Sequence, residues 1–300
     1  MKAPSFFLIV NPIAGHRRGA AVFPEVRREL ERRKAEFDYY FTNEPMEAAD
    51  IAKMVIEKGY TQIVAMGGDG TINEVVNGMI ELGCEMPLGV IPTGNGNDFA
   101  RMHGIPLSPL DAISVLFSGR NTVIDLGYVE EDRYFVNGIG IGIDAQVARD
   151  VLLAKRLRGA PAYYLSAVRQ VLSFHAFSVS VSVAGDDCCK EHRLISLGIA
   201  NGKYAGGGFQ MAPRAKTNDG LLDLCAIEDM PVLKRLVSLP LARRGGHIGL
   251  SEVDYRQAPG FEVSSPTKLI AHMDGEEHWI PKPSFRVSVA KSALQVLIPR

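Results

Sequence analysis

Cysteine is scarce in this sequence, with four residues in 300. None lies in a C-x-x-C pair, and no spacing of cysteine and histidine matches a zinc site. Scattered, unpaired cysteines are typical of proteins in a reducing compartment. We therefore expect a cytoplasmic protein without a zinc centre.

The sequence also lacks a long apolar run and a strong net charge. The first apolar stretch, residues 6–10, stops at Asn-Pro and is too short for a signal peptide. No later run approaches the ~20 residues of a membrane span. A formal net charge of -1 argues against a generally basic nucleic-acid-binding protein. The remaining composition, 46% hydrophobic and 22% charged, is that of a globular protein with a substantial core.

The first part of the chain alternates between strand-like and helix-like patterns, which predicts parallel strands in a three-layer α/β domain. Ligands bind such domains at the carboxyl ends of the strands. The expected strands are residues 6–10, 37–41, 63–66 and 88–91, and the expected helices are residues 20–34, 45–58 and about 72–82.

After about Ile124 short β-like stretches dominate, which predicts a second, mostly antiparallel domain with a few helices. We place the domains at residues 1–125 and 126–289. The expected strands are residues 132–137, 177–183, 194–200, 221–227, 261–263 and 269–273, with two more near the C-terminus, and the expected helices are residues 144–155, 162–172 and 231–243.

Three glycine-rich turns follow strands of the first domain: NPIAG at 11–15, GGDG at 67–70 and PTGNGNDFA at 92–100. Thr71 and Glu74 fit a capping box, which predicts a helix beginning just after Gly70. Glycines and helix amides favour a phosphate, and Asp69 beside it calls for Mg²⁺ or a cationic side chain. A plain turn with Asp69 as a local cap is the alternative. Neither the P-loop nor the G-x-G-x-x-G pattern is present.

Together with NDGLLDL and MDGEE later in the chain, these motifs resemble the diacylglycerol kinase catalytic family, especially its soluble bacterial lipid kinases. The resemblance implies a Rossmann-like domain and a β-sandwich, with the last strand, residues 290–300, returning to the first domain. It also implies ATP and Mg²⁺ as cofactors. The implied ATP-binding residues are Asn11, Pro12, Ile13, Ala14, Gly15, Thr42, Gly67, Gly68, Asp69, Gly70, Thr71, Asn73, Glu74 and Asn95.

The same resemblance implies that Asp274 is the catalytic base, with Glu276 as the alternative base or a metal helper. In an extended segment the two side chains would project to the same face. Asp69 would hold the catalytic Mg²⁺. Without the other motifs, DGEE would be interpreted as a hairpin tip with solvated charges.

A second, structural Mg²⁺ is implied at AKTNDGLLDL, held by the Asp219 carboxylate and the carbonyls of Lys216 and Leu221. A plain Asn-Asp-Gly turn between strands is the alternative. Asp98 and Asp125 are further candidates.

The implied function is an ATP-dependent lipid kinase that converts diacylglycerol to phosphatidic acid. A kinase of a sphingoid base, ceramide or monoacylglycerol, and a non-catalytic lipid- or nucleotide-binding regulator, remain open. The lipid has to be met at a membrane surface, and the basic group Lys155, Arg156 and Arg158 is a candidate for that contact. An exposed edge strand in the second domain would make a homodimer plausible.

Overall fold

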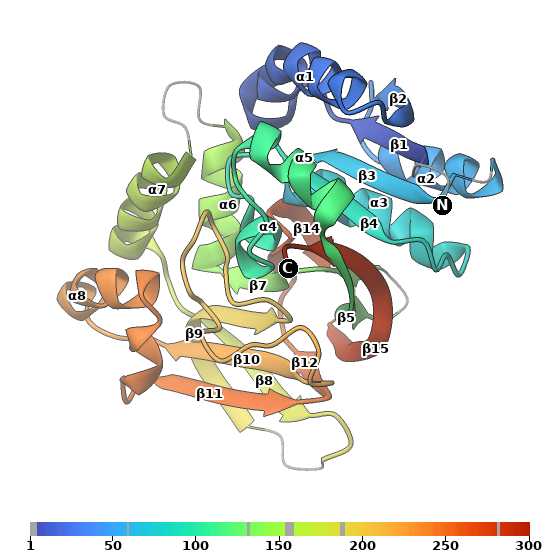
Figure 1. The fold of residues 1–300 in the computed structure, drawn as a ribbon. Coiled ribbons are helices and arrows are strands. Elements are labelled where there is room, and N and C mark those ends of the chain that lie inside the picture. Colours follow the sequence, from blue (N-terminus) through green and yellow to red (C-terminus); the bar gives the residue numbers. More distant parts are fainter. Residues whose placement is uncertain (1–4, 59, 131–132, 154–158, 187–189, 281–282) are drawn as a thin grey trace. The chain divides into compact units, whose positions relative to one another are not determined.

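The computed structural model describes residues 5–58, 60–130, 133–153, 159–186, 190–280 and 283–300 (Figure 1). It divides into two compact units, which we call the N-terminal unit (residues 1–124 with 292–300) and the C-terminal unit (residues 125–291). The basic group Lys155, Arg156 and Arg158 lies outside the described residues. No helix in the described ranges is long and apolar enough to cross a membrane.

A parallel sheet forms the middle of the N-terminal unit, with neighbouring strands in the order β4, β3, β1, β2. Its strands are β1 (Ser5–Val10), β2 (Glu36–Phe41), β3 (Gln62–Gly67) and β4 (Leu88–Pro92). All six residues of β3 are buried, as expected for a central strand covered on both faces. The four strands predicted for this part of the sequence are confirmed within one residue at each end.

Helices cover both faces of this sheet. They are α1 (Ala14–Arg32), α2 (Glu47–Glu57), α3 (Asp69–Glu81) and α5 (Pro109–Ser118), and a short helix, α4 (Asp98–Met102), follows the loop after β4. Phe6 and Leu8 of β1 pack in one buried cluster with α1 and α5. The alternate residues, Phe7 and Ile9, point to the other face, where α2 and α3 pack together against β1 and β3.

The first helix differs from its predicted bounds because it begins inside the glycine-rich turn. Gly15, His16 and Arg17 have φ values of 58°, 59° and 70°, so the chain makes a left-handed turn before the regular helix. Such residues are uncommon outside glycine and concentrate at functional sites. The helices α4 and α5 were not predicted.

The C-terminal unit is built from antiparallel strands. They are β6 (Tyr134–Phe135), β7 (Gly138–Gly142), β8 (Phe177–Val183), β9 (Lys190–Ala200), β10 (Leu222–Glu228), β11 (Val253–Ala258), β12 (Gly260–Ser264), β13 (Leu269–Met273) and β14 (Glu276–Ile280). Strand β9 pairs with β10 along one edge and with β7 and then β8 along the other.

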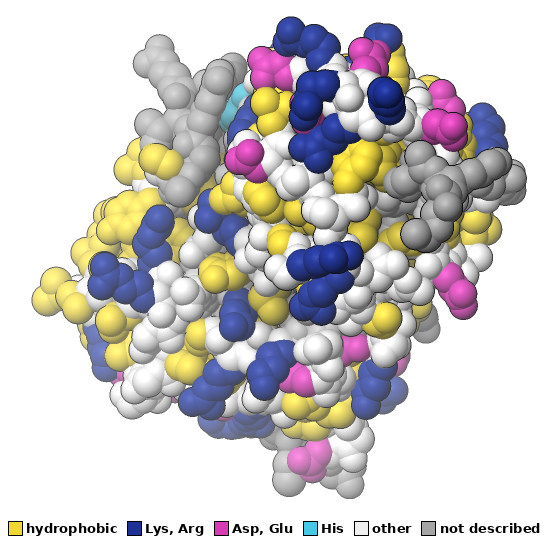
Figure 2. All heavy atoms as spheres, viewed as in Figure 1, with side chains coloured by type: hydrophobic (Ala, Val, Ile, Leu, Met, Phe, Trp, Pro, Cys, Tyr) yellow, Lys and Arg dark blue, Asp and Glu magenta, His cyan; other side chains and the backbone are white. Residues whose placement is uncertain are grey.

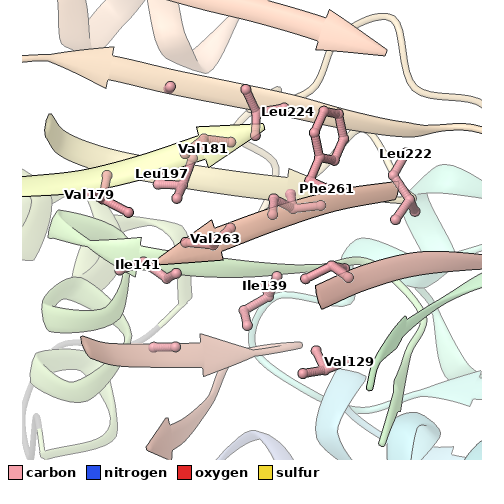
Figure 3. Packing of buried hydrophobic residues seen from close by; sticks show 14 of the residues in the cluster. Val129, Ile139, Ile141, Val179, Val181, Leu197, Leu222, Leu224, Phe261 and Val263 are labelled. Atoms are coloured by element: carbon pink, nitrogen blue, oxygen red, sulfur yellow. The ribbon is translucent and has the colours of Figure 1, made fainter. Parts of the chain in front are cut away.

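Inward-facing side chains from these strands form one buried cluster. Figure 3 shows Ile139, Leu197, Leu224 and Phe261, from four different strands, within it. Phe261 is fully buried, and each such side chain contributes roughly 1.5–3 kcal/mol through its burial. This cluster supports the strands that carry the polar groups described below.

Helices α6 (Ile143–Leu153), α7 (Gly159–Ser173) and α8 (Val232–Arg243) pack around a smaller cluster of their own. All three were predicted within three residues at each end. A short 3₁₀ helix, Gly246–Gly249, follows α8.

Two strands belong to both units. Strand β5 (Arg120–Val129) runs from the N-terminal unit into the C-terminal unit. Strand β15 (Ser284–Ile298) first pairs antiparallel with β12, and later places Val296 beside Leu88 of β4 in a parallel pair. The two β-like segments predicted near the C-terminus are therefore one strand, interrupted at Ser292, where φ is 51°.

Gly127→Ala is expected to destabilise the C-terminal unit by about 1–3 kcal/mol. An added Cβ would overlap the ring of Phe135, which is fully buried and precedes the segment that binds Asp274. Urea unfolding followed by circular dichroism measures the loss. Gly249→Ala is the matched control, because a Cβ there meets no atom within 4 Å. Equal unfolding midpoints for the two variants would contradict the packing argument.

Candidate active site

Asn11 ties the loop after β1 to the start of α3. Its Oδ1 accepts the backbone N–H groups of Ile13 and Ala14, both at 3.1 Å, and its Nδ2 donates to Thr71 Oγ1 at 3.0 Å. Pro12 is half-buried, whereas the Ile13 side chain is exposed. The asparagine therefore fixes the shape of this loop and its distance from the next glycine-rich loop.

The predicted capping box at Thr71 and Glu74 is wrong. Helix α3 begins at Asp69, and its N-cap residue is Gly68, which forms no side-chain cap. Thr71 already lies inside the helix, where Asn11 holds its hydroxyl. Glu74 Oε2 instead accepts the backbone N–H of Ala48 at 3.2 Å, in the first turn of α2. Thr71 and Glu74 thus bond to residues distant in the sequence instead of capping their own helix.

Asp69 caps a helix other than its own. Its Oδ2 accepts the backbone N–H of Asp98 at 3.2 Å, and its Oδ1 accepts that of Phe99 at 2.9 Å, at the start of α4. A carboxylate is stabilised there by the amides and by the helix dipole. Asp98 itself is buried. Asp69 thus joins the loops that follow β3 and β4.

The three glycine-rich loops lie against one another at the carboxyl edge of the sheet. A Cβ on Gly15 would overlap the carbonyl oxygen of Thr93, and a Cβ on Gly94 would lie 2.5 Å from the Cα of Gly68. Thr93 donates its N–H to the Gly67 carbonyl at 2.8 Å. The loops therefore present mostly backbone to any ligand, and any side chain at these glycines would push them apart.

In the PTGNGNDFA loop, Thr93 Oγ1 and Asn97 Oδ1 are buried polar atoms with no hydrogen-bond partner among the described residues. Asn97 has φ 54° and donates its Nδ2 to the Gly94 carbonyl at 3.0 Å. Buried polar atoms are nearly always satisfied, by protein, water or ligand. Neither residue was singled out from the sequence, although both lie in the quoted PTGNGNDFA motif.

The other residues expected to bind ATP have different surroundings. Thr42 is buried and bonds to the last carbonyl of β1, that of Val10. Asn73 is buried within α3 and accepts from Asn77. Asn95 is exposed at the third loop. Gly70 lies in the first turn of α3.

Asp274 lies in the C-terminal unit, at a two-residue Asp-Gly turn between β13 and β14. Asp274 and Gly275 have φ values of 50° and 89°, as in the tight turns that Asp-Gly favours. The side chain is buried rather than solvated. The segment is not extended at Asp274, so the condition under which Asp274 and Glu276 would share a face is not met. Glu276 is the half-buried first residue of β14.

Three successive backbone amides donate to the Asp274 carboxylate. Oδ2 accepts from Val136 at 2.7 Å, and Oδ1 accepts from Asn137 at 2.8 Å and from Gly138 at 3.0 Å. The three donors compensate the buried charge and fix the orientation of the carboxylate. Sequence patterns gave no sign of this partner segment, which lies more than a hundred residues away.

A polar network connects this carboxylate with the Asp219 turn. Asn201, fully buried, donates its Nδ2 to the carbonyls of Val136 at 3.0 Å and Asp125 at 2.9 Å. Asp125 Oδ2 in turn accepts the N–H of Gly220 at 2.8 Å. Both expected sites of the C-terminal unit are therefore held by one continuous set of hydrogen bonds.

The Asp219 turn offers oxygen ligands of the kind that Mg²⁺ prefers. The Asp219 side chain is exposed, and its Oδ1 accepts the N–H of Leu221 at 3.1 Å. Lys291 also lies over the turn, since a Cβ on Gly220 would be 3.0 Å from its Nζ. In the described part of the chain, no group of three His, Cys, Asp or Glu residues could hold a metal. A metal here would need carbonyl ligands, such as those of Lys216 and Leu221.

Asp144, which was not singled out from the sequence, lies close to the Asp274 turn. Ser196 Oγ donates to its Oδ2 at 2.8 Å, and burial raises the pKa of Asp144 to about 6. His272 lies beside the same glycine as Asp144, since a Cβ on Gly140 would overlap His272 Nε2 and lie 2.9 Å from Asp144 Cβ. The His272 ring accepts the Gly275 N–H at 3.4 Å, and burial lowers its pKa to about 4. An aspartate beginning a helix after GIGIGI is the signal that could have marked this cluster.

Asp144→Asn is expected to gain stability relative to the unchanged protein as pH rises from about 4 to about 6. The folded pKa of Asp144 lies above its unfolded value of about 3.9, so ionisation through this window costs the native state free energy. The difference between the two proteins should grow by about 2 kcal/mol. Urea unfolding at pH 4 and pH 7 measures it. The lowered pKa of His272 makes stability rise with pH over this range, which is the opposite direction. Both proteins contain His272, so its contribution cancels when their unfolding free energies are subtracted. A difference independent of pH would contradict the shifted pKa.

Two family profiles match this chain. The diacylglycerol kinase catalytic domain matches residues 5–129, and the YegS C-terminal NAD kinase beta sandwich-like domain matches residues 137–298. A crystal structure from Bacillus anthracis superposes with a TM-score of 0.82 at 22% identity, covering 99% of this chain and 98% of the other. This likeness establishes the fold: a three-layer α/β domain and a β-sandwich domain.

Among curated relatives, a diacylglycerol kinase of Staphylococcus saprophyticus is 32% identical over 271 residues, covering 90% of this chain and 88% of the relative. A diacylglycerol kinase of Staphylococcus aureus is 32% identical over 90% of this chain and 85% of its own length. The chain therefore belongs to the diacylglycerol kinase family, and it is a lipid kinase that uses ATP.

Proposed function

We propose that this kinase transfers the γ-phosphate of ATP to the free hydroxyl of diacylglycerol and forms phosphatidic acid. The observation that carries the proposal is the 32% identity, over nine-tenths of the chain, to relatives named diacylglycerol kinase. The alternative acceptors are a sphingoid base, ceramide and monoacylglycerol, and each is included in the experiment described below.

The ATP phosphates are assigned to the three loops of the N-terminal unit. Backbone amides at the start of α3 attract phosphate oxygens, and Gly15, Gly68 and Gly94 allow a close approach. Thr93 Oγ1 and Asn97 Oδ1 are buried atoms that a bound nucleotide or its water could satisfy. Of the residues expected from the motifs, those in the loops fit direct contact with phosphate. Thr42, Asn73 and Glu74 fit support of the loops.

Mg²⁺ is assigned first to Asp69, beside the phosphates. Each carboxylate oxygen can accept more than one partner, so the amide bonds from Asp98 and Phe99 are compatible with a role in metal binding. When bound, the ion would neutralise charge on the β- and γ-phosphates. The protein itself fixes the direction of the Asp69 carboxylate through α4.

Asp274 is assigned as the base. As the lipid oxygen forms its bond to the γ-phosphorus, the bond to the bridging oxygen breaks and ADP leaves with that electron pair. The hydroxyl proton passes to the carboxylate. The three amide donors orient the carboxylate, so little reorganisation is needed at the moment of reaction. Glu276 remains the second candidate.

Phosphate transfer from labelled ATP to a panel of lipids in mixed micelles tests these assignments. The panel contains diacylglycerol, monoacylglycerol, ceramide and sphingosine. Diacylglycerol should be labelled most, and Asp274→Asn should lose about 10²–10⁴-fold in rate, with Glu276→Gln losing much less. Labelling of another lipid alone would overturn the assigned substrate.

The Asp274→Asn variant needs a control, because its amide group would face the Val136 N–H now bound at 2.7 Å. Asp254→Asn is the matched variant: Asp254 also accepts several donors, including Arg256, but lies on β11. Thermal unfolding and ATP affinity are measured for both. Rate loss without loss of ATP binding or folding supports a base. Equal loss in the two variants would indicate a structural effect.

A structural Mg²⁺ at the Asp219 turn gives a prediction that needs no activity measurement. Mg²⁺ without ATP should raise the thermal midpoint of the unchanged protein, because a ligand that binds only the native state stabilises it. Asp219→Asn should abolish most of that rise. Sodium chloride at equal ionic strength is the control. The same rise in both proteins would exclude this turn as the site.

Peripheral contact with a membrane surface is part of the proposal, since diacylglycerol resides in the bilayer. A homodimer stays a prediction. Strand β11 pairs only with β10 among the described strands, so β11 is the candidate edge strand through which two copies would pair.

A further inference from the structure

Exposed apolar side chains of the C-terminal unit gather on two neighbouring helices. Among the side chains of this unit whose exposure the structure describes, every large hydrophobic one that is exposed lies on α7 or α8. We call this set the α7–α8 face, and it consists of Tyr164, Leu165, Leu172, Val232, Leu233, Val237 and Leu241. Leu233 is 75% exposed and Val237 is 66% exposed. Figure 2 shows hydrophobic side chains at the left edge of the molecule, over these helices.

Helix α8 is apolar on two sides, and only one of them is used by the fold. Leu236 and Leu239 pack into the buried cluster that includes Val171 of α7. Leu233, Val237 and Leu241 are spaced four residues apart, so they form a stripe on the outer side. Packing against this cluster explains why Leu236 and Leu239 are apolar. The outer stripe has no comparable role within the described chain, and contiguous exposed apolar surface marks an interaction site.

The two helices form a rigid platform. The buried guanidinium of Arg235 donates to the carbonyls of Val171 at 3.3 Å and Phe174 at 2.9 Å, at the C-terminal end of α7. It also pairs with Asp229 at 2.6 Å. On its other side, α7 is bound to α6 because Gln170 donates to Asp150 at 2.8 Å. The outer leucines of both helices are therefore displayed in a fixed arrangement.

The charged side chains on these two helices have one sign. Neither α7 nor α8 contains an aspartate or glutamate. Arg169 on α7 and Arg243 at the end of α8 are exposed, and Arg244 follows directly. Figure 2 shows basic side chains among the hydrophobic ones there. An apolar centre with a basic rim is complementary to an anionic lipid surface. It is not complementary to itself, because two copies facing each other would oppose arginines.

We propose that the α7–α8 face docks on a bilayer containing anionic lipid, with Leu233 and Val237 entering the interface and Arg169, Arg243 and Arg244 meeting the headgroups. The inference rests on the proposed function, because docking on a bilayer would bring the kinase to its lipid substrate. The docking itself can be measured without ATP or catalysis.

The test is sedimentation of the full chain with vesicles of phosphatidylcholine, alone or with 30% phosphatidylglycerol (about one lipid in three, enough for a strongly negative surface). The variant is Leu233→Gln with Val237→Gln. The control is Leu82→Gln with Val123→Gln, which removes apolar side chains that are each 46% exposed in the N-terminal unit. We expect the unchanged protein and the control to bind the anionic vesicles at least tenfold better than the neutral ones. The variant should need at least tenfold more anionic lipid for half-binding.

A second measurement separates docking from catalysis. Phosphorylation of a short-chain diacylglycerol, kept below its micelle concentration, should be unchanged in the variant, whereas phosphorylation of diacylglycerol in anionic vesicles should fall at least fivefold. Unaltered vesicle binding by the variant would overturn the docking proposal. Loss of a dimer in light scattering, with vesicle binding intact, would make the face a self-association surface and would also overturn it. Failure of the unchanged protein to phosphorylate any lipid, with docking intact, would refute only the function.

Discussion

The carboxylate of Asp274 and the three amides that donate to it form the interaction on which the candidate site depends. A buried charge is costly unless it is compensated, and here the backbone of residues 136–138 compensates it. The same bonds hold the β13–β14 turn against the start of β7. Through Asn201 and Asp125 they continue to the Gly220 turn. The proposed base is thus also the residue that holds the neighbouring turn and strand in place.

The N-terminal unit uses acidic side chains in a related way. Asp69 caps α4 and Glu74 reaches the first turn of α2, so each carboxylate joins a helix to a different segment of the unit. In both units, then, a carboxylate of the candidate residues Asp69, Glu74 and Asp274 is placed against backbone amides. Amides are fixed in position, whereas long basic side chains lose rotamer freedom when they are held. Fixed amide donors therefore suit carboxylates whose proposed roles require a constant orientation.

The alternation of strands and helices was readable from the sequence because the first sheet is buried on both faces and its strands are continuous apolar runs. Local signals failed where tertiary partners competed with them. Thr71 and Glu74 have the spacing of a cap, but Asn11 and Ala48 bind them instead. Asp274 resembled a solvated hairpin tip because nothing in its neighbourhood reveals the distant amides. The loops that bear the candidate site were found by their glycines, yet the contacts that order them were not.

Strand β15 completes both units, and it follows every other strand in the sequence. During synthesis on the ribosome, strands β1 to β4 are therefore made long before residues 292–298, which complete the N-terminal sheet. Until then, β4 presents an unpaired edge next to hydrophobic side chains, which is a hazard for aggregation. Because β15 comes last, the N-terminal unit can be completed only after the C-terminal unit has been translated. While the C-terminal unit is being translated, the open edge of β4 is accessible to chaperones.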